Sequence, residues 1–248
     1  MLMTETLFSY LDLAQRYLPV ATTSAPSFSA IVDIAQALPP LPLTIFESHL
    51  DDPRPDVDFL LSATPKQLLN QLPSGHHVKE WAAIQELCQI WQNLPESDPF
   101  RQAVLWLWLE FDTSANRKNS DSPAIYFLEG FAHYNRERVK MVEITAVLKR
   151  LLERDPTLAM QKQFARIFQA LPSSGRLFSL GNMSGRDSTA VRVSLAGIPA
   201  SYLVQYLHDI AWPGDLSEIE ALIASYSPFL IIWHWILTLE NILAPKLG

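Results

Sequence analysis

The sequence has very little cysteine and little glycine. Cys88 is the single cysteine among 248 residues, so no internal disulfide can form. Glycine contributes 8 residues and proline 18, and the prolines fall mostly between segments with regular hydrophobic spacing. We therefore use the prolines as markers of the boundaries between helices and strands.

Positive charge is also scarce. Lysine and arginine together number 19, against 26 acidic residues, and the formal net charge is -7. The chain has neither the basic footprint of a nucleic-acid-binding protein nor an acidic tail. No nucleic-acid partner is expected.

The chain has no long hydrophobic run and no leader pattern. The longest apolar run, Phe229 to Leu239, is about half of the roughly 20 residues that a membrane helix requires, and His234 interrupts it. The first residues, MLMTETLFSYLDLAQRYLP, have no basic region ahead of an apolar core. We expect a cytoplasmic protein without a membrane partner.

Helical and strand patterns alternate along the chain. With 48% apolar residues the chain can form a sizeable core, and its spacing predicts two helices followed by two strands, several times over. The predicted strand pairs begin near residues 43, 104, 177 and 229, and the last pair lacks its second strand. The pattern predicts a single α+β domain over residues 1–248, in rounds of about 1–62, 63–131, 132–196 and 197–248.

The strand predicted at AVLWLWLEFD has hydrocarbon on one face and a mixed set of side chains on the other, because successive strand residues point to opposite faces. The dry face has Leu105, Leu107, Leu109 and Phe111, and the mixed face has Trp106, Trp108, Glu110 and Asp112. The segments DVDFLL and AVRVSLA follow the same rule, which leaves Asp56, Asp58, Arg192 and Ser194 on the mixed face. We expect helices to cover the dry face of an antiparallel sheet.

The mixed face must also be covered, because two neighbouring tryptophans exposed to water would be costly. A sheet curled into a barrel or half-barrel with its helices outside would place them in a lumen. Aromatic walls with a few polar groups are what a ligand chamber contains. We expect this curled sheet, and the alternative is two α/β sandwiches related by duplication.

Antiparallel strand pairs alternating with helix pairs resemble the ABBA or PT-barrel fold of aromatic prenyltransferases, including those that modify cyanobactin peptides. The resemblance is one of element order over almost the whole chain. It implies a lumen in which basic side chains hold an isoprenoid diphosphate, accompanied by Mg²⁺, while aromatic residues shield an allyl cation. The resemblance assigns the shield to Trp106, Trp108, Tyr126 and either Trp233 or Trp235, and the diphosphate to Arg186 and Arg192.

Glu110 and His234 are the candidate catalytic residues, to orient or deprotonate an acceptor. Glu110 lies two residues from Asp112, so both carboxylates can face one space, where a general base or a cation-binding pair can work. The plainer interpretation is the wet end of a strand, and for His234, which lies between two tryptophans, it is a core histidine. No histidine pair has the spacing of a zinc-binding helix, so no metal site is expected.

The loop SGRDS, with Arg186, is either an anion site or an ordinary hairpin loop. No P-loop spacing, dinucleotide-binding glycine pattern or nucleophile elbow occurs in it.

Two functions of different classes fit these residues. The first is a transferase, with prenyl transfer to an aromatic or nucleophilic group of a small molecule or peptide as the leading example. The second is a non-catalytic barrel that binds a ligand or peptide as an accessory subunit. Several inward-facing basic residues would favour the enzyme, and only Arg192 is clearly placed on a strand. An acidic, aromatic lining favours a cationic or hydrogen-bond-donating group. No oligomeric state is predicted.

Overall fold

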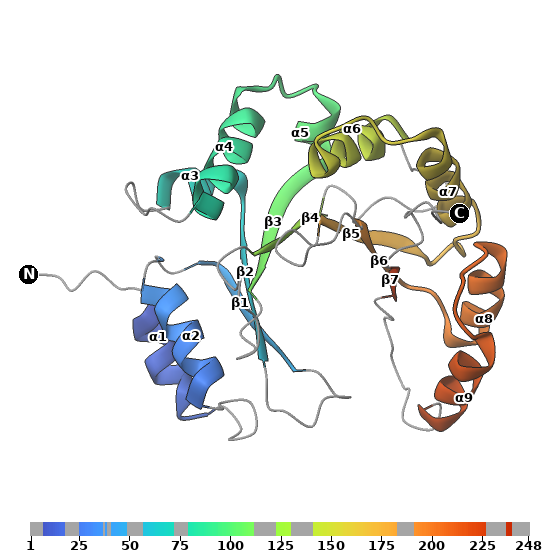
Figure 1. The fold of residues 1–248 in the computed structure, drawn as a ribbon, viewed down its shortest axis with the longest axis horizontal. Helices are drawn as coiled ribbons and strands as arrows, with labels where there is room; N and C mark the ends of the chain where they lie inside the picture. Colours follow the sequence, from blue (N-terminus) through green and yellow to red (C-terminus); the bar gives the residue numbers. More distant parts are fainter. Residues whose placement is uncertain are drawn as a thin grey trace, which may run out of the picture. The chain divides into compact units, whose positions relative to one another are not determined.

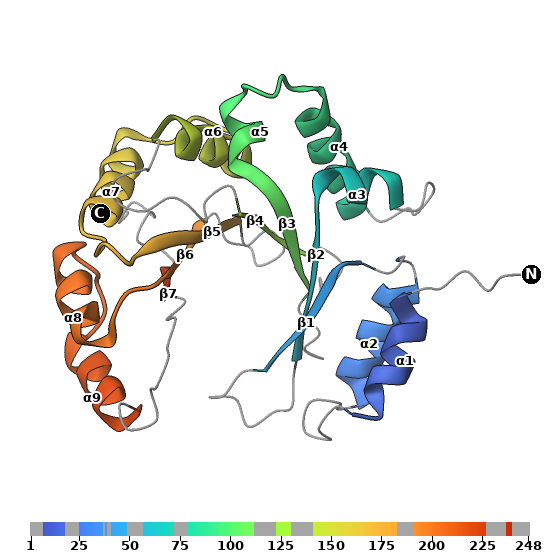
Figure 2. The same cartoon turned by 180° about the vertical axis from the view of Figure 1, so that it is seen from behind.

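A computed structural model describes ten parts of the chain: residues 7–17, 25–36, 38, 41–48, 57–71, 79–111, 123–129, 141–182, 191–226 and 237–239. The chain divides into two compact units, and each is described by itself. Unit 1 comprises residues 1–95, 106–126 and 184–188, and unit 2 comprises the remainder. Figure 1 labels the helices and strands, and Figure 2 shows them from behind.

Unit 1 contains helices and antiparallel strands. Its elements are α1 (Leu7–Gln15), α2 (Ala25–Gln36), β1 (Leu43–Ser48), β2 (Val57–Ala63), α3 (Pro65–Gln71), α4 (Lys79–Asn93), most of β3 (Val104–Phe111) and the start of β4 (Ala124–Glu129). Strand β2 pairs with β1 along one edge and with β3 along the other, antiparallel in both cases. The helices α1 to α4 lie on one side of these three strands (Figures 1 and 2).

Unit 2 has the same kinds of element. They are α5 (Pro99–Ala103), α6 (Met141–Leu152), α7 (Leu158–Gln169), β5 (Arg176–Asn182), β6 (Val191–Ala196), α8 (Ala200–Asp209), α9 (Leu216–Tyr226) and β7 (Leu237–Leu239), together with the start of β3 and the end of β4. Strand β6 pairs antiparallel with β5 and with β7. The Asn182 side chain at the end of β5 donates a hydrogen bond of 2.9 Å to the carbonyl of Leu151, at the end of α6.

The α+β class and the antiparallel pairing predicted from the sequence are confirmed. The repeated units, the barrel and the single domain stay predictions. Helix α5 was not predicted, because five residues are too short to show a helical period. Of the last predicted strand, residues 229–240, only β7 lies within the described residues.

Polar side chains at the helix starts explain where several helices begin. Before α5, the Asp98 carboxylate accepts hydrogen bonds from the backbone N–H groups of Phe100 and Arg101. Before α3, Thr64 and Gln67 form a capping box: the Thr64 hydroxyl accepts from the Gln67 N–H at 3.2 Å, and the Gln67 side chain accepts from the Thr64 N–H at 2.9 Å. These side chains satisfy donors that the first helical turn leaves open.

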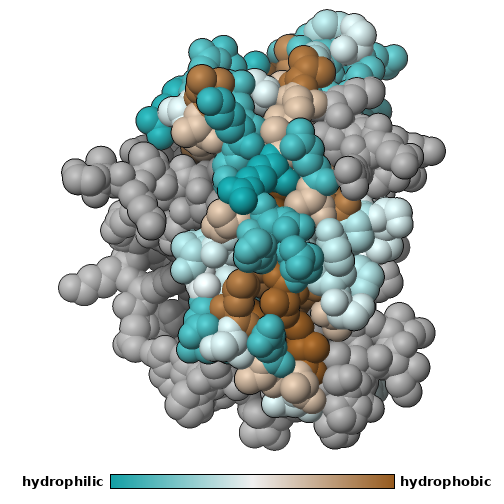
Figure 3. Space-filling view, turned by 90° about the vertical axis from the view of Figure 1, so that its right-hand side faces the viewer, coloured by the Kyte–Doolittle hydropathy of each residue, from teal (hydrophilic) through white to brown (hydrophobic). Residues whose placement is uncertain are grey.

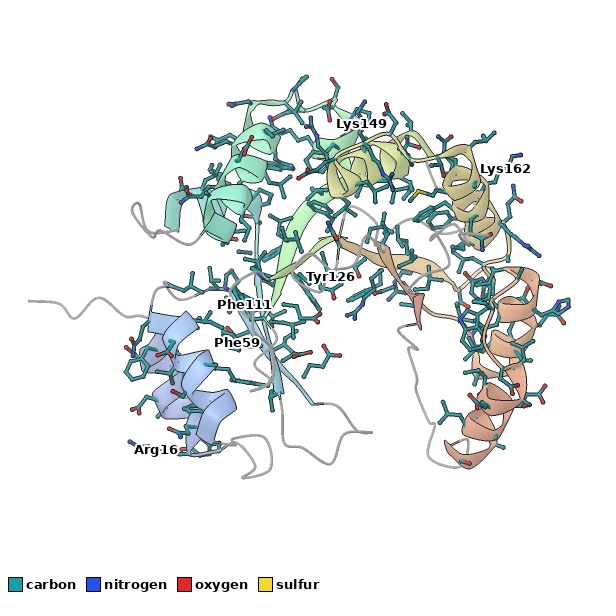
Figure 4. All side chains as sticks on the ribbon, in the orientation of Figure 1. Arg16, Phe59, Phe111, Tyr126, Lys149 and Lys162 are labelled. Atoms are coloured by element: carbon teal, nitrogen blue, oxygen red, sulfur yellow. The ribbon has the colours of Figure 1, made fainter. Side chains whose placement is uncertain are left out.

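The dry face predicted for β3 is confirmed over most of its length. Leu107, Leu109 and Phe111 are 1 to 2% exposed, and Phe111 pairs opposite Phe59 on β2, which is fully buried. Figure 4 labels Phe59 and Phe111. Leu105 has the same parity but is 46% exposed at the start of the strand, so the expectation that this side chain would be covered was wrong.

The core of unit 2 includes regularly spaced apolar residues of two helices. Ile144, Leu148 and Leu151 of α6 are buried, as are Phe164 and Ile167 of α7. A fully buried tyrosine, Tyr206 of α8, donates its hydroxyl to the Ile167 carbonyl at 3.2 Å. Helices α7 and α8 are therefore joined by a buried hydrogen bond.

Glu143 is a buried carboxyl group in the first turn of α6. Its side chain is 2% exposed, and burial raises the pKa of Glu143 above its usual value of 4.5. Folding therefore favours the protonated form of the Glu143 carboxyl group. The contribution of this group to the free energy of unfolding is fully present at pH values below the ordinary pKa, and it is lost as the pH rises through the folded-state pKa.

We expect Glu143→Gln to flatten the dependence of stability on pH. The neutral amide has a similar shape and never ionises, so the variant should gain stability relative to the parent as the pH rises from about 4 to about 8. Urea unfolding of both proteins across that range measures the difference. Parallel curves would show that Glu143 titrates alike in the folded and unfolded chains.

Candidate functional site

The mixed face of unit 1 brings acidic and aromatic residues onto neighbouring strands. Asp58, Leu60 and Ser62 are every second residue of β2 and therefore lie on the same face of the strand. On β3, Glu110 pairs opposite Leu60, and Trp108 pairs opposite Ser62. Asp58 and Glu110 are therefore diagonal neighbours on one face, within reach of a single ligand group.

The polar residues of this face are buried. Asp58 is 4% exposed, Ser62 is 3% exposed and Glu110 is 5% exposed, while Trp106 and Trp108 are half-buried. The plainer interpretation of Glu110, the wet end of a strand, is wrong for this reason. Asp58, Trp108 and Glu110 each already take part in an interaction, so a ligand group would add to these contacts or exchange with them.

The strand register adds two residues that sequence reasoning missed. Glu47 of β1 pairs opposite Asp58 and is exposed, so a third carboxylate stands at the edge of the acidic pair. Ser62 contributes a buried hydroxyl beside Trp108. Alternation along DVDFLLS was enough to identify Ser62, whereas Glu47 depends on the register of β1 against β2.

Tyr126 lies on β4 with its side chain 4% exposed. Its neighbour Phe127 packs edge-on against Phe100 of α5, with ring centroids 5.5 Å apart, so Phe127 faces the helical side. Alternation then places Tyr126 on the face away from α5. Figure 4 labels Tyr126.

Unit 2 has a mixed face of different chemistry. Val191, Val193 and Leu195 of β6 are buried, which confirms their predicted dry parity. On the other face, Ser194 of β6 pairs opposite Ser179 of β5, and both are buried. Arg192, half-buried, pairs opposite Gly181 and already has an interaction partner.

Three predicted site residues lie outside the described residues: Asp112, Arg186 and His234. Their assignments stay predictions, as do those of Trp233 and Trp235. Within the described residues, no group of three or more histidine, cysteine or acidic side chains is placed to hold a metal ion.

The acidic and aromatic side chains of the unit 1 face are groups that can interact with positive charge. Two carboxylates in a partly desolvated site interact more strongly with a cation than they would in water. The face of a neighbouring tryptophan ring attracts cations as well. The same carboxylates can accept hydrogen bonds from an amine, a guanidinium or an indole N–H.

Comparisons with models of protein families, with curated proteins and with solved structures found no match to this chain. In the part of the chain that the structure describes, no helix has the length and apolar character to cross a membrane.

Proposed function

We propose that the mixed face of unit 1 binds a cationic or hydrogen-bond-donating group that stands beside an aromatic ring, and that the protein is a ligand- or peptide-binding module. One observation supports this best: Asp58 and Glu110 are buried on adjacent strands, on the face that carries Trp108. A purely structural face would more often carry apolar side chains at such positions, because burying carboxylates is costly.

A matched pair of small molecules tests the charge preference. Tryptamine carries an ammonium group on an indole, and indole-3-propionate carries a carboxylate on the same ring. We expect tryptamine to bind and indole-3-propionate not to bind, because the carboxylates repel the anion. Titration calorimetry measures both, and equal binding of the two would contradict the proposal.

We expect Glu110→Gln and Trp108→Ala each to weaken tryptamine binding by roughly 1 to 3 kcal/mol, the range for losing a partner in a buried charged contact. Asp12→Asn, on the exposed part of α1 in the same unit, is the control and should bind as the parent does. Thermal unfolding of each variant verifies that it is folded. If all three variants bind alike, the ligand site lies elsewhere.

The second candidate is the transferase expected from the resemblance to PT-barrel prenyltransferases. Glu110 is buried and lies two residues from Trp108, on the same face of β3. It supports the transferase as the group that would orient or deprotonate an acceptor. The barrel or half-barrel and the repeated units belong to this proposal and rest on the strand alternation of the sequence. In this proposal Arg192, with Arg186, would hold the diphosphate with Mg²⁺.

Thermal shift with dimethylallyl and geranyl diphosphates, each with and without Mg²⁺, distinguishes the two candidates. Stabilisation by either compound supports the transferase. No stabilisation, together with tryptamine binding, supports the binding module.

A further inference from the structure

Helix α9 differs from its neighbour α8 in how little of it is buried. Three residues of α8 are buried: Leu203, Tyr206 and Leu207. Helix α9 contacts α8, yet no side chain from residue 216 to residue 225 is buried. An apolar helical face that is only partly covered can bind another helix.

The apolar residues of α9 form one stripe. Leu216, Ile219 and Ile223 are spaced three and four residues apart and are half-buried, and Leu222 at the border of the stripe is 44% exposed. Figure 3 shows a brown, apolar area at the height where Figure 1 places α8 and α9.

Acidic residues flank the stripe on both sides. Glu218 lies one turn before Leu222, and Glu220 lies one turn after Leu216, so the two carboxylates stand at opposite edges. Asp215 lies just before the helix, where its carboxylate accepts hydrogen bonds from the N–H and the hydroxyl of Ser217. Residues 215–226 include no lysine or arginine.

We propose that this acidic-edged stripe of α9 docks a basic amphipathic helix of another protein. A helix with apolar residues at positions i, i+3, i+4 and i+7 would cover the stripe, and lysine or arginine beside them would pair with Glu218 and Glu220. Two copies of α9 packed on each other would bring acidic edges together, so charge complementarity favours a basic partner over self-association.

A single introduced thiol reports directly on the stripe. The native thiol of Cys88 is fully buried, and burial raises the pKa of Cys88 to about 12, so it does not react with maleimide in the folded protein. Leu222→Cys therefore supplies the one reactive thiol. The probe is a synthetic helix of about 18 residues made of leucine and lysine in the spacing above.

We expect rapid maleimide labelling of the Leu222→Cys protein and at least tenfold slower labelling with the leucine–lysine peptide. The same peptide with glutamate in place of lysine should give no protection. Slow labelling without peptide would overturn the proposal: if dilution restores the rate, a second copy covers the stripe, and if it does not, the chain's own residues cover it.

Charge reversal separates specific docking from general attraction to an acidic protein. The double substitution Glu218→Lys and Glu220→Lys, in the Leu222→Cys background, should transfer protection from the lysine peptide to the glutamate peptide. Ala221→Lys, on the opposite face of α9, is the matched control and should leave the lysine peptide protective. Loss of protection in this control, or none in any protein, would overturn the proposal.

Discussion

Gly197→Ala is expected to lower the free energy of unfolding by roughly 2 to 4 kcal/mol, through left-handed backbone strain and local overpacking. Gly197 lies between β6 and α8 with a φ of 76°, a conformation that favours glycine. A Cβ atom there would overlap the backbone carbonyl oxygen of Ser174, before β5. Backbone cannot swing aside as a side chain can, so the strain has to spread into the sheet.

The contact between Gly197 and Ser174 is fixed by a second interaction. The Ser174 hydroxyl donates a hydrogen bond of 2.6 Å to the Gly197 carbonyl, which holds the start of β5 beside the end of β6. Urea unfolding of the alanine variant measures the loss of stability.

Gly175→Ala is the matched control for the left-handed conformation. The φ of Gly175 lies outside the left-handed region, and its added Cβ would meet the end of the Leu171 side chain and the ring of Pro172, each at 2.9 Å. The Leu171 side chain can shift, so the loss should be smaller than for Gly197→Ala. Equal losses would show that crowding, rather than the backbone conformation, sets the effect.

Strand alternation could be predicted from the sequence because its period of two is a local property. It correctly placed Phe59 and Leu107 on the dry face and Asp58 and Trp108 on the mixed face. It failed at Leu105, because the end of a strand can leave its covering layer even when the parity is right.

Register could not be predicted from the sequence, because it depends on which residues of two strands form hydrogen bonds with each other. Glu110 stands opposite Leu60, which is two residues from Asp58 on the same face of β2. This placement follows only from the pairing of β2 with β3. In β5 a register shift between Leu177 and Ser179 interrupts the simple alternation. Parity alone therefore does not place the hydroxyl of Ser179.

Helix α5 shows a local signal that periodicity does not use. Five residues give no recognisable stripe, but Asp98 followed by Pro99 is a typical helix start. Capping chemistry would therefore have indicated a boundary that hydrophobic spacing missed.

Phe59→Ala is expected to lower the free energy of unfolding by about 3 to 5 kcal/mol, the range for truncating a buried aromatic ring in a packed core. The ring of Phe59 is fully buried on the dry face of β2, pairs opposite Phe111, and lies 5.6 Å from the ring of Phe46 between centroids. Its removal leaves a cavity that neighbours on two strands cannot fill without moving the sheet.

The control for Phe59→Ala is Leu43→Ala, at the start of β1 in the same unit. Leu43 is 45% exposed, so its truncation should cost about 0.5 kcal/mol or less. Urea unfolding of both variants compares the dry face with a surface position. If Phe59→Ala cost no more than Leu43→Ala, the face that carries Phe59 would not be the packed face. The acidic face of Asp58 and Glu110 would then be the one against the helices, and the ligand-binding proposal would lose its basis.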